Sequence, residues 1–132
     1  MYLESFMGQM DILYHFSQFN RKGIIMSKYE LKFWFEHGGT CIWGKSDSAK
    51  EKFGYAIDNE KLPVSKELIE KLNDLEEEYS TYIDWNEPQN PSPWSEEQKK
   101  KFLNRANLAH QDLKNQLGED FEVVNDVSSC VE

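Results

Sequence analysis

The sequence predicts an α+β fold in which a small antiparallel sheet, made of an N-terminal hairpin and a C-terminal strand, carries two antiparallel helices on one face. Three observations lead to this prediction. Residues 29–36 alternate between apolar and polar side chains, two later segments repeat apolar residues at helical spacing, and a proline-rich stretch separates those segments. A chain of 132 residues can bury one core, so we expect a single α+β domain.

The first element is a β-hairpin. Residues 29–36 place Tyr, Leu and two Phe on one face and charged residues with one Trp on the other, which is typical of a half-buried strand. A Gly-Gly pair follows after one residue and can form a two-residue turn, because glycine adopts positive φ at no steric cost. This register puts Phe35 opposite Ile42 in the core. It puts Trp34 opposite Trp43 on the other face.

Shorter elements follow the hairpin and close the domain. Ser46 can cap a short helix that runs to Lys52, and residues 53–57 can form a third strand. Residues 121–124, with one Phe and two Val, are expected to form a last strand beside the hairpin. The domain is therefore expected to cover residues 26–127, and residues 128–132 are expected to form a loose tail.

Two helices are predicted from their caps and apolar stripes. Ser65 is a good N-cap, and the helix after it should end near Trp85. Ser95 begins a capping box with Gln98, and Gly118 stands where a left-handed residue ends a helix. The buried stripes are Leu68, Leu72, Leu75, Tyr79 and Tyr82 in the first helix and Phe102, Ala106, Ala109, Leu113 and Leu117 in the second. Three prolines between the helices force an extended connection.

The first 25 residues differ from the rest of the chain. Their four charged side chains cancel, and residues 6–19 have an apolar pattern of helical spacing without a good cap at its end. Residues 21–25 can be encoded by a purine-rich ribosome-binding site and its spacer, which would make Met26 the native start. Residues 1–25 are therefore either a translated leader or an N-terminal amphipathic helix that packs on the domain.

The net charge of the chain limits the classes of partner that it can bind. The sequence has 24 acidic side chains and 15 Lys or Arg, a formal net charge of -9. Nucleic-acid backbones and anionic membranes are bound by cationic side chains, so we expect neither as a partner. No apolar run reaches the length of a membrane span, and two cysteines are too few for a disulfide framework. We expect a cytoplasmic protein.

The sequence carries no catalytic or metal-binding signature. His37 and Cys41 are the one His and Cys pair close together, and Cys41 is expected opposite Glu36, on the Trp34 face of the hairpin or at its edge. A nucleophilic pair would also need an oxyanion pocket, so we expect a thiol without function. Residues 74 and 76–78 form a run of carboxylates, but residues 76–78 point in different directions around a helix, which does not fit a metal site. We expect no catalytic residue, metal ligand or cofactor.

An acidic surface with large aromatic side chains is the main functional feature of the sequence. Helix residues 65–84 carry seven acidic and two basic side chains, and the next residue is Trp85. Carboxylates can steer a basic partner while Trp side chains anchor it. The expected partner-binding residues are Trp34, Trp43, Glu76, Glu77, Asp84, Trp85, Glu87 and Trp94. The alternative is structural, with Trp85 and Trp94 packing the helix ends and the hairpin Trp pair in the core.

Four segments carry a resemblance to a known family. They are residues 31–36 (LKFWFE), 41–44 (CIWG), 62–65 (LPVS) and 90–94 (NPSPW). Over about residues 28 to 126 the chain resembles an uncharacterised family of small acidic bacterial cytosolic proteins, which are similar to the immunity proteins of polymorphic toxin systems. The resemblance implies a bacterial, non-enzymatic protein and leaves residues 1–25 outside.

The resemblance and the charge together predict a function. We expect a non-enzymatic, acidic protein-binding module, an immunity protein that neutralises a basic bacterial toxin by covering its active site. The alternative is a regulatory or scaffolding domain that binds a peptide or protein through the hairpin and its Trp-rich surface. An enzyme that uses Cys41 or the carboxylates is a third interpretation.

Overall fold

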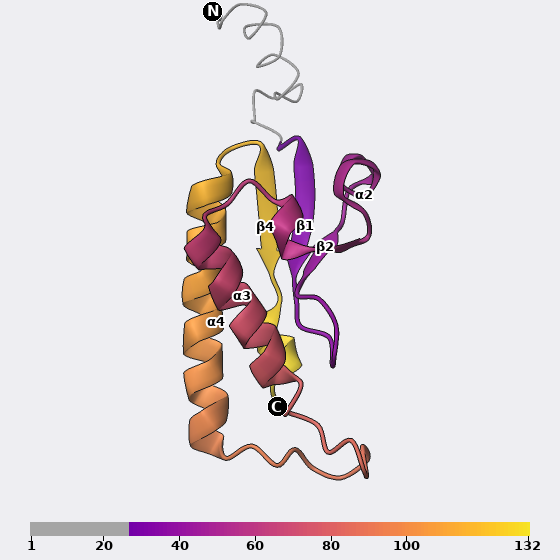
Figure 1. Ribbon diagram of the computed structural model, residues 1–132, viewed down its shortest axis with the longest axis vertical. Coiled ribbons are helices and arrows are strands. Elements are labelled where there is room, and N and C mark those ends of the chain that lie inside the picture. Colours follow the sequence, from indigo (N-terminus) through magenta and orange to yellow (C-terminus); the bar gives the residue numbers. More distant parts are fainter. Residues whose placement is uncertain (1–26) are drawn as a thin grey trace, which may run out of the picture.

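The structure is a computed structural model that describes residues 27–132 (Figure 1). Its elements follow in the order β1 Tyr29–Phe33, β2 Ile42–Gly44, α2 Asp47–Phe53, β3 Ala56–Ile57, α3 Lys66–Tyr79, α4 Glu96–Leu117 and β4 Phe121–Asn125, with 3₁₀ helices at Asn59–Lys61 and Val127–Cys130. Both interpretations of residues 1–25, as leader or as helix, lie outside the described residues.

A four-stranded sheet forms the centre of the molecule, in the order β3-β2-β1-β4. The β1–β2 and β2–β3 pairs are antiparallel but the β1–β4 pair is parallel, so the prediction of a purely antiparallel sheet is wrong. The reason is the route of the chain. After β3, the helices α3 and α4 form a crossover, and α4 returns the chain to the end of the sheet where β1 begins (Figure 1). The α+β class is confirmed.

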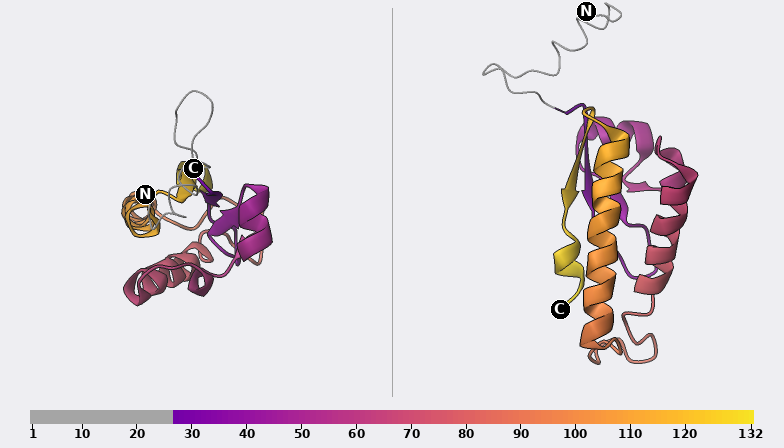
Figure 2. Two further views of the ribbon diagram at one scale, coloured as in Figure 1. Left: turned by 90° about the horizontal axis from the view of Figure 1, so that it is seen from above. Right: turned by 90° about the vertical axis from the view of Figure 1, so that its left-hand side faces the viewer.

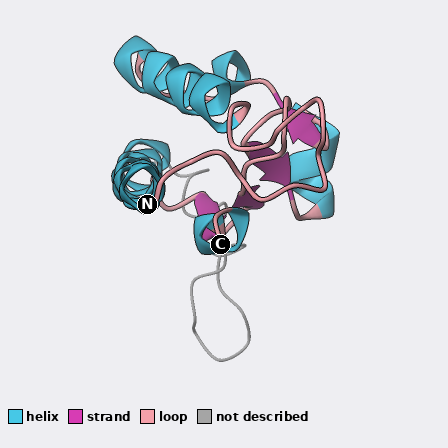
Figure 3. Ribbon diagram, turned by 90° about the horizontal axis from the view of Figure 1, so that it is seen from below, coloured by secondary structure: helices cyan, strands magenta, loops and turns pink. Residues whose placement is uncertain are grey.

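The predicted helix pair and its buried stripes are confirmed. The helices α3 and α4 run antiparallel and lie side by side on one face of the sheet (Figure 2). Seen from below, the strands lie between this pair and the short helix α2 (Figure 3). The stripe residues buried in the core are Leu68, Leu72, Leu75 and Tyr79 from α3 and Phe102, Ala106, Ala109, Leu113 and Leu117 from α4, whereas Tyr82 is partly buried.

The hairpin has a different register from the predicted one. Phe33, rather than Phe35, pairs with Ile42, and Lys32 pairs with Trp43. A shift of two residues keeps every side chain on its original face. Phe35 and Ile42 therefore still point into the core, as predicted. The two Trp rings are still neighbours, with centroids 6.0 Å apart, although Trp34 is not directly opposite Trp43.

The register differs because the turn is longer than a Gly-Gly pair. The Glu36 N–H donates to the Thr40 carbonyl at 3.4 Å, so three residues form the loop, and Gly38 takes the left-handed conformation with φ 72°. One step further, the Trp34 N–H donates to the Cys41 carbonyl at 2.9 Å. Two residues on the first strand thus match one on the second, which makes Phe35 a bulge residue.

The bulge at Phe35 is contacted by the C-terminal segment. The Phe35 N–H has no partner across the hairpin and instead donates to Cys130 Sγ at 3.2 Å. The Tyr79 hydroxyl donates to the Cys130 carbonyl at 2.7 Å, and Cys130 and Val131 are both buried. Within residues 128–132, which the sequence predicts as a loose tail, Cys130 thus satisfies a buried backbone donor and packs into the core with Val131.

Local capping was predicted well, but two helix boundaries differ. Ser65 and Ser95 accept hydrogen bonds from the N–H groups three residues later, as expected of N-caps, and Gly118 has φ 81°. The helix α3 ends at Tyr79 rather than near Trp85. The Ser80 and Thr81 hydroxyls donate to carbonyls of the last turn and compete with further helical hydrogen bonds.

The segment after Ser46 is helical for one residue longer than predicted. Ser46 caps α2, which extends through Phe53, and Phe53 is buried. The third strand consequently starts late and consists of Ala56 and Ile57 alone, paired with β2. This short edge strand is relevant to binding because Tyr55, the residue just before it, is exposed on the outer face of the sheet.

Candidate binding surfaces

The structure separates the predicted partner-binding residues into three groups. Trp34 and Trp43 lie on the outer face of the sheet. Four others lie at the end of α3 and in the loop that follows it: Glu77, Asp84, Trp85 and Glu87. The remaining two, Glu76 and Trp94, are held by contacts inside the domain. The eight residues therefore do not form one continuous patch.

Trp94 is a core residue. It is 6% exposed, and its ring packs against Tyr82 and Phe102 with centroid distances of 5.2 and 5.1 Å. Its indole N–H donates to Thr81 Oγ1 at 2.8 Å, which satisfies the one polar group of the side chain. The structure therefore places the Trp94 side chain in the core, with little of its surface open to a partner.

Glu76 also has a structural role. Its Oε2 accepts hydrogen bonds from the Cys41 N–H at 3.0 Å and from Asn59 Nδ2 at 3.2 Å. Asn59 is the buried polar residue of the described domain, at 3% exposure, and a second hydrogen bond joins it to Asn73. The Glu76 carboxylate thus ties α3 to the hairpin and to the 3₁₀ helix Asn59–Lys61, and its acceptor atom is occupied.

Trp85 is a large aromatic side chain that the loop after α3 presents to solvent. It is 59% exposed, and its indole N–H donates to the Ser80 carbonyl at 2.7 Å, which caps the end of the helix. The ring lies over Gly38 at the hairpin tip, where a Cβ would be 3.7 Å from Trp85 Cη2. The orientation of the ring is therefore set from two sides while most of its surface remains open.

The carboxylates near Trp85 include residues that the sequence analysis did not select. Glu77 is exposed, and it continues a row along the outer face of α3 at the spacing of one helical face. We call this row the acidic stripe; it consists of Glu67, Glu70, Asp74 and Glu77. Helical spacing alone was sufficient to find it. Glu78 does not belong to it, because Arg105 binds its carboxylate with two hydrogen bonds of 2.7 and 2.8 Å.

Asp84 and Glu87 shape the loop after α3. The Asp84 carboxylate accepts hydrogen bonds from the backbone N–H groups of Asn86 and Glu87, at 3.0 and 3.3 Å. Asn90 in turn donates to Glu87 Oε1 at 3.0 Å. Both carboxylates therefore stabilise turns, and Glu87 remains exposed. Together with Trp85 and the acidic stripe they form what we call the α3 surface.

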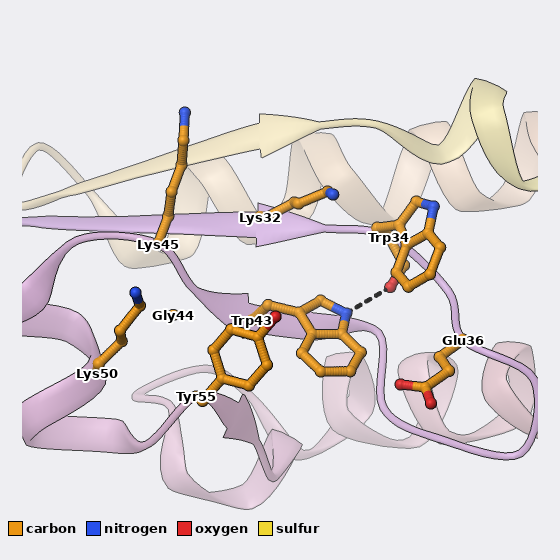
Figure 4. Close-up of a pocket in the computed structure, with 8 residues that line it drawn as sticks. All are labelled: Lys32, Trp34, Glu36, Trp43, Gly44, Lys45, Lys50 and Tyr55. Carbon is orange, nitrogen blue, oxygen red and sulfur yellow. Dashed lines mark hydrogen bonds between the residues drawn. The ribbon is translucent and has the colours of Figure 1, made fainter.

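The outer face of the sheet has a different chemistry. A groove of about 540 Å³ lies between α2 and the hairpin (Figure 4). It is lined by Lys32, Trp34, Glu36, Trp43, Gly44, Lys45, Lys50 and Tyr55, and we call it the sheet-face groove. The sequence analysis selected its two Trp residues but missed its three lysines, because these lie in three separate segments that only the fold brings together.

Both cysteines are buried among the described residues. Burial, and then the Glu76 charge, raises the pKa of the Cys41 thiol well above its ordinary value, and burial raises the pKa of Cys130. A thiol held in its protonated form is a weak nucleophile. The expected position of Cys41, on the Trp34 face or at the hairpin edge, is wrong. The regular alternation of β2 starts only at Ile42, and Cys41 lies in the core beneath Glu76.

Among residues 27–132, no three His, Cys, Asp or Glu side chains are grouped so that they could hold a metal ion. None of the helices described there combines the length and the apolar character needed to cross a membrane.

His110, in α4, contacts the Val123 carbonyl with Nε2 at 2.7 Å, which joins the helix to β4.

Charge is distributed unevenly along the described chain. Residues 27–61, which form β1, β2, α2 and β3, carry six acidic and six basic side chains. Residues 62–132, which contain α3, α4 and β4, carry 16 acidic and seven basic side chains. The whole formal charge of -9 therefore belongs to the second part.

These features define a class of small α+β domain that keeps its thiols inside and presents charged and aromatic side chains outside. The chain belongs to the Serratia CdiI immunity protein-like family, whose model matches residues 29–126. The match runs from the first residue of β1 to just beyond β4, so it covers the sheet and both long helices. The resemblance to immunity proteins is confirmed. Among curated proteins, none matches the chain.

Proposed function

We propose that this protein is a non-enzymatic immunity protein that binds a basic bacterial toxin in the cytoplasm and neutralises it by covering the toxin's active site. Membership of the Serratia CdiI immunity protein-like family supports a role in binding and neutralising a toxin. The burial of both thiols supports a role without nucleophilic chemistry. The basic character of the toxin is inferred from the surface of this chain.

The α3 surface is the proposed contact. Its four stripe carboxylates are exposed, and they lie in one row that leads towards the loop carrying Trp85. Rows of like charge accelerate encounter with an oppositely charged protein, since they attract it over distances beyond contact. A large aromatic side chain then supplies buried area once the complex forms, and Trp is enriched among such anchors.

The exposure of Trp85 is the observation that carries this assignment. A Trp side chain is usually well buried, yet 59% of this one is open to solvent. Its ring is held by the hydrogen bond to Ser80 and by the hairpin tip. The side chain would therefore lose little conformational freedom when a partner binds. An exposed and fixed aromatic ring, in the loop that follows a row of carboxylates, suits an anchor for a basic partner.

Co-expression with the candidate toxin tests the proposal. The partner to use is the C-terminal domain of a large toxin-like protein encoded next to this gene, and the readouts are growth of the host and affinity of the purified pair. The full chain should restore growth. Trp85→Ala should weaken binding roughly thirtyfold, because truncating an anchoring aromatic costs about 2 kcal/mol or more. Tyr55→Ala, which truncates an aromatic of 64% exposure on the sheet face, is the matched control.

A charge experiment tests the basic character of the partner. Glu70→Gln with Glu77→Gln removes two charges from the acidic stripe and should slow association and flatten its dependence on salt. Glu119→Gln with Glu122→Gln removes two exposed charges elsewhere and should change the rate much less. Salt-independent binding would contradict the electrostatic part of the proposal. Unchanged binding by Trp85→Ala, together with capture of a partner through the hairpin, would favour the regulatory or scaffolding alternative.

A further inference from the structure

The sheet-face groove is basic in a protein that is otherwise strongly acidic. Three of its eight lining side chains are lysines, and Glu36 is the one acid among them. Lys32 forms an ion pair of 3.5 Å with Asp126. Lys45 and Lys50 have no carboxylate partner within the described residues, and both are exposed. Two cationic groups of the groove are therefore available to an anionic group from outside.

The aromatic part of the groove is fixed in place. The Trp43 indole N–H donates to the Trp34 carbonyl at 2.8 Å, which prevents rotation of the ring. Tyr55 packs against Trp43 edge to face, with centroids 5.3 Å apart. Lys32 lies 5.1 Å from the centre of the Trp34 ring and Lys50 lies 5.9 Å from that of Tyr55, so the cations surround the aromatic surface (Figure 4).

We propose that the sheet-face groove binds a short acidic segment of a protein, with an apolar or aromatic side chain of that segment on Trp43 and Tyr55 and its carboxylates on Lys45 and Lys50. The charge of the groove selects the occupant, since carboxylates are the groups that two free ammonium groups attract. The volume of about 540 Å³ suits a few side chains rather than a whole domain. This site is separate from the α3 surface and does not depend on the toxin proposal.

A nucleic acid fits the same groove less well. Aromatic rings and lysines can bind single strands, but a strand extends as a continuous row of phosphates. Glu36 lies in the lining itself, and residues 62–132 carry the full formal charge of -9. A short segment can place its carboxylates at Lys45 and Lys50 and keep them away from Glu36, whereas a phosphate chain cannot avoid the acidic surroundings.

Peptide titration followed by NMR tests the proposal on the full chain. The ligand is the blocked pentapeptide Asp-Glu-Phe-Glu-Asp, and the readouts are the four Trp indole N–H signals and the Gly44 and Lys45 amides. We expect shifts of the Trp34 and Trp43 indoles and of both amides, with the Trp85 and Trp94 indoles unchanged. Tyr55→Ala should weaken binding at least threefold, and Trp85→Ala should leave it unchanged.

Matched charge reversals separate a specific site from general attraction. Lys45→Glu with Lys50→Glu should weaken binding at least tenfold. Lys100→Glu with Lys101→Glu changes the net charge equally on an exposed part of α4 and should weaken it less than twofold. An equal loss in both double variants would overturn the proposal. So would equal binding of the pentapeptide Lys-Lys-Phe-Lys-Lys, absence of indole shifts at millimolar peptide, or the same shifts at lower concentration of a single-stranded oligonucleotide.

Discussion

The two parts of this domain share one core but present opposite chemistry to solvent. Residues 27–61 are electrically neutral as a group and place lysines around Trp43 and Tyr55 on the sheet face. Residues 62–132 carry the full formal charge of -9 and place carboxylates beside Trp85. The comparison teaches that the net charge of a chain does not describe each of its surfaces. Trp34 and Trp43, which the sequence analysis grouped with the acidic residues, lie in the less acidic part.

The two parts differ in their surfaces although they are joined in the interior. The ring of Phe35 from the hairpin packs on Phe102 of α4 with centroids 5.1 Å apart. The Glu76 carboxylate crosses the same boundary to reach the Cys41 N–H. Because both apolar and polar contacts cross the boundary, we expect the parts to fold together. Three predictions, ordered by expected size, test how complete this coupling is.

The largest effect is expected from Phe35→Ala. The side chain is 1% exposed and contacts rings from both parts, so its removal should lower the free energy of unfolding by about 3–5 kcal/mol. Urea unfolding followed by far-UV circular dichroism and by Trp fluorescence should give one coincident transition. Two separate transitions would show that the parts unfold independently. Tyr55→Ala, at an exposed position, should change the stability by less than about 0.5 kcal/mol.

A smaller effect is expected from Glu76→Ala. Removing the carboxylate leaves the Cys41 N–H without an acceptor and takes from the buried Asn59 amide one of its two acceptors, the other being Asn73, which costs about 1–3 kcal/mol. Glu76→Gln keeps one oxygen acceptor and should cost less. Glu77→Ala, one residue along the same helix, should change stability by less than about 0.5 kcal/mol, because its side chain is exposed. If Glu76→Ala and Glu77→Ala lowered the free energy of unfolding equally, the structural role assigned to the Glu76 carboxylate would be contradicted.

The smallest effect concerns the pH dependence of stability. The pKa of Cys41 is raised in the folded state above its ordinary value of 9.0 by burial and by Glu76. Above about pH 9 the unfolded chain releases the thiol proton and the folded chain retains it, so stability falls by at most about 1.4 kcal/mol per pH unit. Below the ordinary pKa both states hold the proton, and this effect is absent. Urea midpoints between pH 8 and 10 measure it.

Cys41→Ala is the variant that isolates this contribution. It should flatten the decline in stability above pH 9, whatever its effect on stability at neutral pH. Cys130 remains as a second buried thiol whose pKa is also raised, so part of the decline should persist. An unchanged slope in Cys41→Ala would show that the Cys41 thiol does not contribute to the decline in stability.

Local features of this protein were predicted well from the sequence. Ser65 and Ser95 cap their helices because each serine hydroxyl accepts a hydrogen bond from an N–H group only three residues later in the chain. The helical stripes were also correct, since a period of 3.6 residues reports which face is buried. The end of α3 was missed because the hydroxyls of Ser80 and Thr81 compete with the helix, which propensity alone does not weigh.

The predicted partner-binding residues differ in how much of each side chain is open to solvent. Trp85 and Glu77 are exposed, whereas Trp94 is buried and Glu76 accepts hydrogen bonds inside the domain. All four lie near the ends of helices with similar local composition. Their difference arises from neighbours distant in the sequence: the hairpin donates to Glu76, and α4 covers Trp94. The sequence around each residue contains no information about these neighbours.

The helices, their caps and their buried faces could be predicted from the sequence because they depend on contacts within a few residues, and the order of these elements predicts the class of the fold. The parallel pairing of β4 with β1, the burial of Cys130 and the gathering of three lysines around the Trp pair arise only from tertiary contacts. These features depend on where the chain returns after α4 and on a bulge at Phe35. Such long-range pairing is selected by the packing of the whole core, so no single segment encodes it.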